Sequence, residues 1–344
     1  MRSGYFSLQN YYTVMVNIGN ISLGEFPLLL APMEDVSDPP FRAVCKDQGA
    51  DMMYTEFISA EGLIRDARKS VHKLDIFDNE RPVGIQIFGD KIESMRLASA
   101  VVERSNPELL DINYGCPVKK VAGKGAGAGI LLDLPKMQKM TKEIVKQVSL
   151  PVTVKTRLGW DENSVRILEV AQRLQDVGIK ALTIHGRTRA QMYKGEANWQ
   201  HIADVRNHPS IHIPVFGNGD IDSVQKAAEY KNKYMVDGIM IGRAAIGNPW
   251  IFRDIKHFLK TGEILDGPDI SERVSVVKKH LKFSLEWKGE RTGINEMKRH
   301  YTTYFKGIPD FKPFRTQLIL TDKVDRLLEL LDEIEETFQI NVPG

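Results

Sequence analysis

The sequence predicts an α/β fold: a (β/α)₈ TIM barrel followed by a smaller, all-helical C-terminal domain. Short apolar runs alternate with amphipathic helical segments over about 220 residues, which is the length expected of eight βα units. After Asn248 the alternation ends, and only helical patterns continue to the C-terminus. With 344 residues, 42% of them hydrophobic, the chain is long and apolar enough for a barrel with one additional domain.

Each expected strand is a short apolar run that ends in a polar residue or a Gly/Pro turn. The eight runs cover residues 28–31, 52–55, 83–88, 110–113, 152–155, 181–185, 215–217 and 238–241. Helical spacing of apolar residues is clearest between them, at residues 91–104, 135–148 and 164–177. Pro135 suits the first turn of a helix, and Gly178 suits a helix end.

The segment before the first strand divides into two parts. Residues 1–14 are expected to be a disordered extension or a misplaced start. Residues 16–26 place a Gly19-Asn20 turn between apolar stretches, which predicts a hairpin that closes the bottom of the barrel. The predicted division of the chain is therefore an extension at 1–14, a barrel at 15–258 and a helical domain at 259–344.

The C-terminal helices carry an uneven charge. They are expected at residues 255–261, 271–288, 293–305, 312–319 and 321–337. Residues 278–315 contain ten Lys or Arg and four Asp or Glu, whereas residues 322–336 contain seven acidic and two basic residues. A basic face within a chain of net charge +2 favours a polyanion partner over an ordinary solvated helix surface. Lys298 and Arg299 stand beside aromatic residues, a pattern that suits RNA phosphates and stacked bases.

The composition excludes several classes of protein. Cys45 and Cys116 are the only cysteines, so we expect no disulfide framework and a reducing cytoplasmic location. No apolar run reaches about 18 residues, so no membrane-spanning helix is expected. No cluster of His, Cys and Asp has the spacing of metal ligands, so we expect no catalytic metal. The glycines at 123–129 have neither dinucleotide-loop nor phosphate-loop spacing and indicate a flexible loop. Nothing indicates an obligate protein partner.

Polar residues stand at the carboxyl ends of successive strands, where barrels carry their chemistry. In strand order they are Pro32, Met33 and Glu34, then Gln86, then Asn113 and Cys116, then Lys155 and Arg157, then His185 and Arg187, then Asn218, Gly219 and Asp220, and finally Gly242 and Arg243. One such residue would be a satisfied core polar group, but burying several without partners costs on the order of 2–7 kcal/mol each. The ordered set therefore predicts one polar ligand at the mouth of the barrel.

The last two turns suit a phosphate group. Gly219 and Gly242 leave backbone N–H groups accessible, and Arg243 adds a fork of donors near a helix start. Loops after the seventh and eighth strands are where barrels commonly hold a phosphate. Lys155 can place a cation beside an electron-rich ring, and Gln86 can hydrogen-bond to the edge of that ring. These features favour flavin mononucleotide (FMN) over a bare sugar phosphate.

Cys116 follows an apolar run, in the segment Asp-Ile-Asn-Tyr-Gly-Cys-Pro at residues 111–117. A free cysteine is more often a small buried hydrophobe than a reactive group. Gly115 and Pro117 force a turn, however, so this side chain is not expected on a strand face. Three lysines follow closely: Lys119, Lys120 and Lys124. Nearby cations favour a thiolate or a charged ligand, and Cys116 is therefore the predicted catalytic residue.

Together these residues resemble the tRNA-dihydrouridine synthases, and the B-type bacterial branch most closely. The likeness runs over residues 18–258 and continues more weakly through the C-terminal helices. It rests on residues 31–33, 111–121, 182–189, 218–220 and 241–252. The last of these, Ile-Gly-Arg-Ala-Ala-Ile-Gly-Asn-Pro-Trp-Ile-Phe, is close to a family signature. Tyr114 and Glu34 depart from the smaller or apolar residues of many relatives.

The resemblance implies a flavin-bearing barrel joined to a helical RNA-binding domain. The residues implied as FMN contacts are Pro32, Met33, Glu34, Gln86, Lys155, Asn218, Gly219, Asp220, Gly242 and Arg243, with His185 as a further one. The implied reaction reduces specific tRNA uridines to 5,6-dihydrouridine with NADPH as reductant. A hydride from reduced flavin goes to C6 of the uracil, and Cys116 gives a proton to C5, as suits a thiol with an ordinary pKa of about 8.5.

The tRNA substrate is expected to meet several side chains around the barrel mouth and on the helices. Asn113 would hold the uracil, and Lys155 with Arg157 would stabilise negative charge on the ring carbonyl. The predicted substrate-binding residues are Asn113, Arg157, Arg187, Lys119, Lys298 and Arg299, with Lys119 directed at an RNA phosphate. The target base must leave its stack at a cost of a few kcal/mol, which explains a separate RNA-binding domain.

Two other functions compete with this one. A flavin enzyme acting on a free pyrimidine would share the barrel and the cysteine but would not need basic C-terminal helices. A non-catalytic RNA-binding barrel would not need Gln86, Lys155, His185 and Arg243 in one ordered set.

Overall fold

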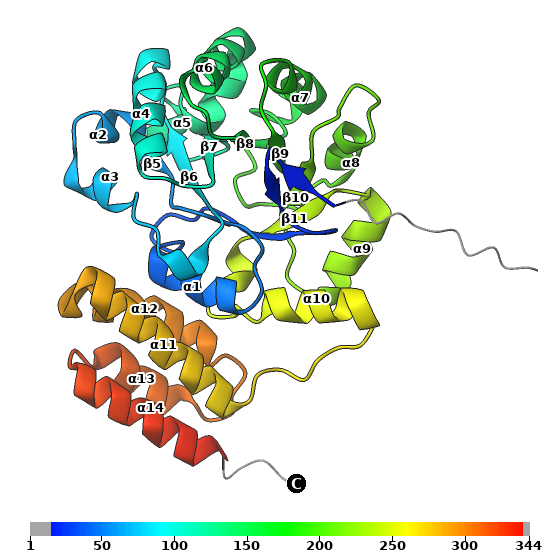
Figure 1. Ribbon diagram of the computed structural model, residues 1–344. Coiled ribbons are helices and arrows are strands. Elements are labelled where there is room, and N and C mark those ends of the chain that lie inside the picture. Colours follow the sequence, from blue (N-terminus) through cyan, green and yellow to red (C-terminus); the bar gives the residue numbers. More distant parts are fainter. Residues whose placement is uncertain (1–14, 340–344) are drawn as a thin grey trace, which may run out of the picture.

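The computed structural model describes residues 15–339, which form a barrel with a helical region below it (Figure 1). The expected extension at residues 1–14 lies outside the described residues. The barrel strands are β3 (Leu28–Leu30), β4 (Met53–Tyr54), β6 (Val83–Phe88), β7 (Leu109–Tyr114), β8 (Val152–Arg157), β9 (Ala181–His185), β10 (Val215–Asn218) and β11 (Gly238–Ile241). They pair in parallel in the order β3-β11-β10-β9-β8-β7-β6-β4, and a bridge between Leu29 and Met52 closes the ring. The predicted (β/α)₈ barrel is confirmed.

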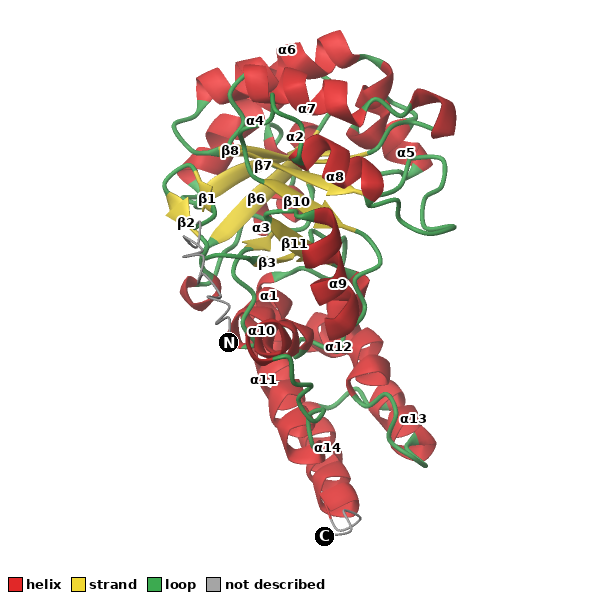
Figure 2. Ribbon diagram, turned by 90° about the vertical axis from the view of Figure 1, so that its right-hand side faces the viewer, coloured by secondary structure: helices red, strands yellow, loops and turns green. Residues whose placement is uncertain are grey.

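A hairpin covers one end of the barrel, as the sequence predicts. β1 (Asn17–Ile18) pairs antiparallel with β2 (Ile21–Ser22) through a turn at Gly19, whose φ of +61° favours glycine. The apolar side chains of the hairpin pack with residues of the barrel interior, among them Leu109 and Phe216. The hairpin and helix α5 (Lys119–Ala122) lie on opposite sides of the barrel (Figure 2). The carboxyl ends of the strands, near α5, are therefore the ends left for a site.

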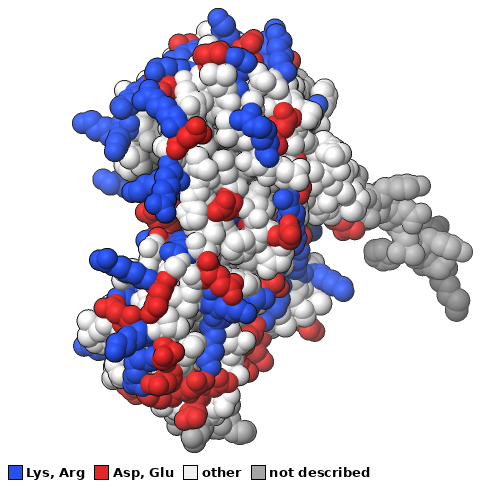
Figure 3. All heavy atoms as spheres, turned by 60° about the vertical axis from the view of Figure 1, so that its left-hand side comes forward, with Lys and Arg blue, Asp and Glu red and all other residues white. Residues whose placement is uncertain are grey.

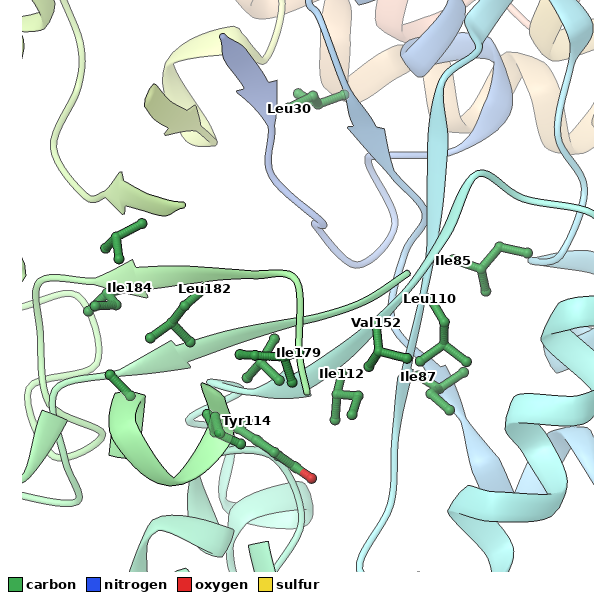
Figure 4. Packing of buried hydrophobic residues seen from close by; sticks show 14 of the residues in the cluster. Leu30, Ile85, Ile87, Leu110, Ile112, Tyr114, Val152, Ile179, Leu182 and Ile184 are labelled. Atoms are coloured by element: carbon green, nitrogen blue, oxygen red, sulfur yellow. The ribbon is translucent and has the colours of Figure 1, made fainter. Parts of the chain in front are cut away.

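The two faces of the barrel sheet bury different residues because side chains alternate along a strand. Leu110, Ile112 and their neighbours face the surrounding helices and form a layer of the main core (Figure 4). Leu109 faces inward, as do Asp111 and Asn113 at the following alternate positions of β7. The interior thus changes from apolar near the hairpin to polar at the carboxyl ends. Each buried Leu or Ile side chain stabilises the fold by roughly 1.5–3 kcal/mol, which offsets the cost of the polar end.

The helices follow the strands as the apolar spacing predicts. Around the barrel they are α1 (Pro39–Asp47), α2 (Ala60–Leu63), α3 (Arg68–His72), α4 (Ile92–Arg104), α5, α6 (Leu134–Gln147), α7 (Ile167–Asp176), α8 (Gln200–Arg206), α9 (Val224–Tyr234) and α10 (Ile251–Thr261). Pro135 stands in the first turn of α6, and the side chain of Asp133 caps that helix by accepting from the backbone N–H of Lys136. Ile255 of α10 still belongs to the barrel core.

The helical region has a core of its own. It consists of α11 (Ile270–Lys288), α12 (Glu290–Tyr304), α13 (Lys312–Leu320) and α14 (Val324–Gln339), and no strand follows β11 among the described residues. Val277, Met297 and Leu330 are among the side chains in the second core. The region extends away from the barrel as two pairs of helices (Figure 2). None of the helices among the described residues is long and apolar enough to cross a membrane.

Aromatic side chains join the helical region to α1. Phe41 of α1 lies 5.7 Å from the ring of His280 and 5.3 Å from the ring of His300, measured between centroids. His280 forms a 3.0 Å hydrogen bond with the hydroxyl of Tyr304. Burial lowers the pKa of His280 to about 3, so its imidazole is neutral and packs as part of this interface.

Polar contacts also fasten the helical region to the segment between β3 and α1 (residues 31–38), which we call the β3–α1 loop. Lys288 of α11 forms an ion pair of 2.5 Å with Asp38 of this loop. Arg299 of α12 donates a hydrogen bond to the backbone carbonyl of Asp35. The middle of the loop, at Asp35, and its end next to α1, at Asp38, are thus held by helices that are more than 200 residues away in the sequence.

Candidate active site

A cavity of about 680 Å³ opens at the carboxyl ends of the barrel strands. Its lining includes most of the residues that the sequence singled out: Pro32, Met33, Glu34, Asn113, Cys116, Lys155, Arg157, His185, Asn218, Gly219, Asp220, Gly242 and Arg243. The strand register explains why they meet. Asn113 is paired with Lys155, and Arg157 is paired with His185, so neighbouring strands present these side chains at the same level.

Cys116 lies in the cavity wall just after β7, and only 7% of the residue is exposed. Its backbone N–H donates to Oδ1 of Asn113 at 2.8 Å, and the N–H of Gly115 donates to the same oxygen at 3.0 Å. Burial raises the pKa of the Cys116 thiol, although the N–H of Val118 and the charge of Arg157 act in the opposite direction. The thiol is therefore protonated at neutral pH.

The expectation that the following lysines favour a thiolate is wrong. Lys119, Lys120 and Lys124 are exposed to solvent, where their charges are screened. Removal of water from around the sulfur outweighs them, because the charged form of a thiol loses more from burial than the neutral form does. The site therefore suits a thiol that gives a proton rather than one that attacks as an anion.

Two further titratable groups face the cavity. Burial lowers the pKa of Lys155 to about 8, and the neighbouring charge of Arg157 contributes in the same direction. Its ammonium has no hydrogen-bond partner among the described residues. Burial and the charges of Lys155 and Arg157 hold the pKa of His185 well below its ordinary value. The cavity therefore contains a neutral imidazole beside a cation without a partner.

The turns after β10 and β11 form the other end of the cavity. Gly219 has a φ of +121°, and a Cβ at this position would lie 2.8 Å from Ala197. The turn therefore requires glycine, and the absent side chain leaves the backbone open to the cavity. Arg243 stands at the mouth with 62% of its side chain exposed. Nδ2 of Asn218 donates to the carbonyl of Met240 at 2.8 Å, which ties the two turns together.

Several predicted residues hold the site together through contacts with the protein itself. Gln86 is fully buried behind Asn113, whose Nδ2 donates to Gln86 Oε1 at 2.7 Å. Arg187 is also buried and forms an ion pair of 2.7 Å with Asp220. Arg157 lines the cavity, but its guanidinium donates to the carbonyls of Gly115, Thr188 and Met192. The two arginines brace the loops around the cavity.

The remaining predicted residues lie outside the cavity. Lys119 is exposed on α5. Lys298 forms an ion pair of 2.5 Å with Asp322 in the helical region, and Arg299 contacts the β3–α1 loop, as described above. These three cations therefore do not line the cavity that contains Cys116.

Two residues at or behind the cavity were not predicted from the sequence to be functional. Tyr193, in the β9–α8 loop, lines the cavity, and its ring lies 5.0 Å from the guanidinium carbon of Arg243 and 5.8 Å from that of Arg157. An aromatic residue in a loop that follows a barrel strand is the sequence feature that could have indicated a binding role for Tyr193. Asp111 lies inside β7 and is 2% exposed, and a carboxylate in an apolar strand was the signal for it.

One group of carboxylates has the geometry of a cation site. Oxygens of Glu34, Asp35 and Glu56 lie within 4.8 Å of one another. Nζ of Lys73 lies 2.6 Å from Glu34 and 3.2 Å from Glu56, so a side-chain cation already pairs with two of the three carboxylates. Glu34, which also lines the cavity, is held at its edge by this contact.

Known proteins resemble this chain in sequence and in fold. The dihydrouridine synthase family model matches residues 29–341. A probable tRNA-dihydrouridine synthase of Rickettsia conorii is 35% identical over 328 residues, which are 94% of this chain and 98% of that protein. The tRNA-dihydrouridine synthase B of Pseudomonas aeruginosa is 38% identical over 303 residues, which are 88% of this chain and 90% of that protein.

Solved structures share the fold at low sequence identity. Histamine dehydrogenase from Rhizobium sp. 4-9 is 10% identical with a TM-score of 0.56, and the match covers 79% of this chain but only 51% of that one. Morphinone reductase in complex with tetrahydroNAD is 12% identical with a TM-score of 0.50, over 76% of this chain and 93% of that one. The likeness is one of architecture, and it agrees with the barrel described above.

Proposed function

Because this chain belongs to the dihydrouridine synthase family, we propose that it reduces specific uridines of tRNA to 5,6-dihydrouridine in the cytoplasm. FMN is the proposed cofactor and NADPH the proposed electron donor, with no obligatory protein partner. One observation carries the proposal beyond the family name. A protonated Cys116 thiol shares a cavity with Asn113, Lys155 and an open glycine turn that suits a phosphate.

The residues of the cavity fit a flavin mononucleotide. The turns at Gly219 and Gly242 offer backbone N–H groups, and the exposed guanidinium of Arg243 adds a cation for the phosphate. Lys155 faces the cavity and has no hydrogen-bond partner within residues 15–339, which suits an electron-rich ring that accepts a hydrogen bond. When bound, the flavin would supply the hydride that C6 of the uracil receives. The other proposed cofactor residues that line the cavity are Pro32, Met33, Glu34, His185, Asn218 and Asp220. Gln86 is proposed to contribute from behind the cavity, by holding Asn113.

The chain's own residues would supply the proton and hold the base. Cys116 gives its Sγ proton to C5 of the uracil, and its thiolate recovers a proton from solvent before the next cycle. Hydride at C6 and proton at C5 together reduce the C5–C6 double bond, so charge and atoms balance. Asn113 holds the ring, and the ammonium of Lys155 stabilises negative charge on a ring carbonyl. Arg157 and Arg187 keep the surrounding loops in place.

The two competing functions make different demands on the molecule. A free-pyrimidine enzyme would not need a helical region fastened to the cavity loop by Lys288 and Arg299. A non-catalytic RNA-binding barrel would not need a buried thiol and a cation without a partner in one cavity. Both observations favour catalysis on an RNA.

Incubation of the purified protein with NADPH and with tRNA from a strain that lacks the enzyme tests the proposal. We expect dihydrouridine to appear in the tRNA, measured by mass spectrometry of its nucleosides, and a flavin absorption spectrum in the protein. The free nucleoside uridine is the matched substrate and should react poorly. Dihydrouridine formation that is equally fast with free uridine would favour the free-pyrimidine enzyme, and a colourless inactive protein would favour the RNA-binding barrel.

The helical region is the proposed tRNA-binding domain, and its cations divide into paired and unpaired ones. Lys278, Lys279, Lys288 and Lys298 all form ion pairs within the protein. Lys306, Lys312 and Arg315 are exposed and have no ion pair among the described residues. Basic side chains line one edge of the face seen in Figure 3, over both the barrel and the helical region, and acidic ones gather toward the far end of the helices.

Replacement of Lys306, Lys312 and Arg315 by Gln is expected to weaken tRNA binding. Each phosphate contact contributes roughly 0.7–0.9 to the slope of log affinity against log salt, so the slope should fall by about 2 to 3. KM for tRNA should rise while turnover at saturating tRNA is retained. Filter binding over a salt series measures the slope. The control removes Lys139, Lys142 and Lys146 from the outer helix α6, far from α13 in Figure 1. Equal losses in both triple variants would argue against a dedicated surface.

A further inference from the structure

A chain of polar side chains crosses the barrel interior behind the cavity. Thr153 Oγ1 donates to Oδ1 of Asp111 at 2.5 Å, and Gln86 Nε2 donates to its Oδ2 at 2.6 Å. Asn113 Nδ2 in turn donates to Gln86 Oε1. Asn113 Oδ1 accepts hydrogen bonds from the backbone N–H groups of Gly115 and Cys116. The strand register creates the chain, since Asp111 is paired with Gln86 on one side and with Thr153 on the other.

The hydrogen bonds from Asp111 through Gln86 and Asn113 to Cys116 have a fixed donor-to-acceptor direction, and Asp111 determines it. An ionised carboxylate only accepts hydrogen bonds, so it turns the NH₂ group of Gln86 toward itself. The carbonyl of Gln86 then faces Asn113 and turns the NH₂ group of that amide toward Gln86. The carbonyl of Asn113 is thereby left for the N–H of Cys116, which needs an acceptor. If either amide were reversed, two donors or two acceptors would face each other inside the barrel.

Asp111 acts from behind the cavity rather than inside it. It does not line the cavity, it is 2% exposed, and both of its side-chain hydrogen-bond partners, Gln86 and Thr153, are neutral, although the charge of Lys155 also acts on it. An apolar residue would cost less there, because a buried carboxylate loses its hydration. Burial raises the pKa of Asp111 to about 6, so the group is ionised at neutral pH but becomes a donor in mild acid. Lys155 and Tyr54 are the other titratable groups that face it.

We propose that Asp111 is a positioning residue for the thiol: through Gln86 and Asn113, it fixes the turn that presents Cys116 to the substrate. The inference deepens the proposed function and rests on it. Asp111 touches neither substrate nor cofactor, and its effect reaches the reaction only as the orientation of two amides and one turn. Asp111 therefore affects proton delivery to the base and does not affect reduction of the flavin by NADPH.

The pair Asp111→Asn and Thr153→Val tests this role. The amide that Asp111→Asn introduces can offer either its carbonyl or its NH₂ group to Gln86, so the direction of the chain is no longer imposed. Thr153→Val removes one hydrogen bond to the same carboxylate but leaves its acceptor character intact. Rapid-mixing measurements separate reduction of the flavin by NADPH from its reoxidation by tRNA. We expect Asp111→Asn to slow reoxidation at least tenfold and to leave reduction within twofold, while Thr153→Val changes both little.

Two further readouts test the role, and the first does not depend on the activity of the variant. Hydrogen exchange of the amides of Gly115 and Cys116 should be faster in Asp111→Asn than in Thr153→Val, because the acceptor of those amides is no longer held. In the wild-type protein, reoxidation should slow as the pH falls through about 6, where Asp111 takes up a proton and becomes a donor. This acidic limb should be absent in Asp111→Asn.

Three results would overturn the inference: equal effects of the two substitutions, equal slowing of both half-reactions, or an acidic limb that persists in Asp111→Asn. If the wild-type protein does not reduce uridine in tRNA at all, the proposed function fails. The exchange comparison at Gly115 and Cys116 still decides the role of Asp111 in that case. If Asp111→Asn does not fold, a wild-type profile of reoxidation that stays flat through about pH 6 would still overturn the inference.

Discussion

Replacement of Cys116 by alanine is expected to slow the reduction of tRNA uridine by about 10²- to 10⁴-fold, the usual contribution of a positioned general acid. That loss corresponds to roughly 3–5 kcal/mol of the activation barrier. The protein should still bind flavin and should still be reduced by NADPH, because the thiol is proposed to act only on C5 of the base. Single-turnover mixing of the reduced variant with tRNA measures the loss.

The direction of the thiol's pKa supports this expectation. Burial raises it above the ordinary value, so Cys116 keeps its proton from acid to beyond neutral pH and holds the proton that C5 needs. The alkylation rate of Cys116 by iodoacetamide should accordingly be slow at pH 7 and should rise only in more alkaline solution. Cys116→Ser should not restore the wild-type rate, since a hydroxyl of much higher pKa is a poorer acid.

Cys45→Ala is the matched control, because Cys45 is the other cysteine and lies fully buried in α1. It should retain wild-type turnover with a small loss of thermal stability. A colourless Cys116→Ala protein, or full turnover by it, would contradict a role as proton donor and would return the residue to a packing role.

Lys155→Met is expected to lower turnover by about 10²- to 10³-fold, which is the usual effect of removing one group that stabilises developing charge. The substitution keeps the length of the side chain and removes the ammonium. Flavin affinity should fall as well, since the ammonium of Lys155 faces the cavity and has no hydrogen-bond partner in the part of the chain that the structure describes. Lys46→Met, at the last turn of α1, is the control because its ammonium is also partly desolvated but lies outside the cavity.

The pH profile of the wild-type protein gives an independent test of Lys155. Its pKa is lowered to about 8, so the ammonium form is present below that pH and is lost above it. Turnover should therefore fall on the alkaline side with a midpoint about 8, while Cys116 remains protonated there. Lys155→Arg should move this midpoint to higher pH. A profile that stays flat to pH 10 would remove Lys155 from the step that limits turnover.

Much of the barrel and of the site could be predicted because both depend on local pattern. The apolar runs fix the strands, and parallel strands bring their carboxyl ends to one edge. Residues as distant as Asn113 and Arg243 are therefore neighbours by topology alone. Local sequence also predicted the hairpin turn at Gly19 and the position of Pro135 in the first turn of α6.

The partners of the charged residues could not be predicted in this way. Whether Arg157 points at a substrate or at backbone carbonyls depends on loops that pack over it, and the sequence does not state their path. Lys298 and Arg299 looked alike in sequence, yet one pairs with Asp322 and the other reaches the barrel. The protonation of Cys116 also depends on burial, which outweighed the lysines that sequence alone made conspicuous.

Because α11 and α12 contact the β3–α1 loop, the barrel and the helical region depend on each other's sequences. The loop that is contacted by Lys288 and Arg299 also contributes residues to the cavity wall: Pro32, Met33 and Glu34. In a chimera that combines this barrel with the helices of a relative, the β3–α1 loop, and with it one wall of the cavity, would be contacted by helices of another protein. Exchange of substrate specificity between relatives should therefore succeed only when the β3–α1 loop is transferred together with the helices.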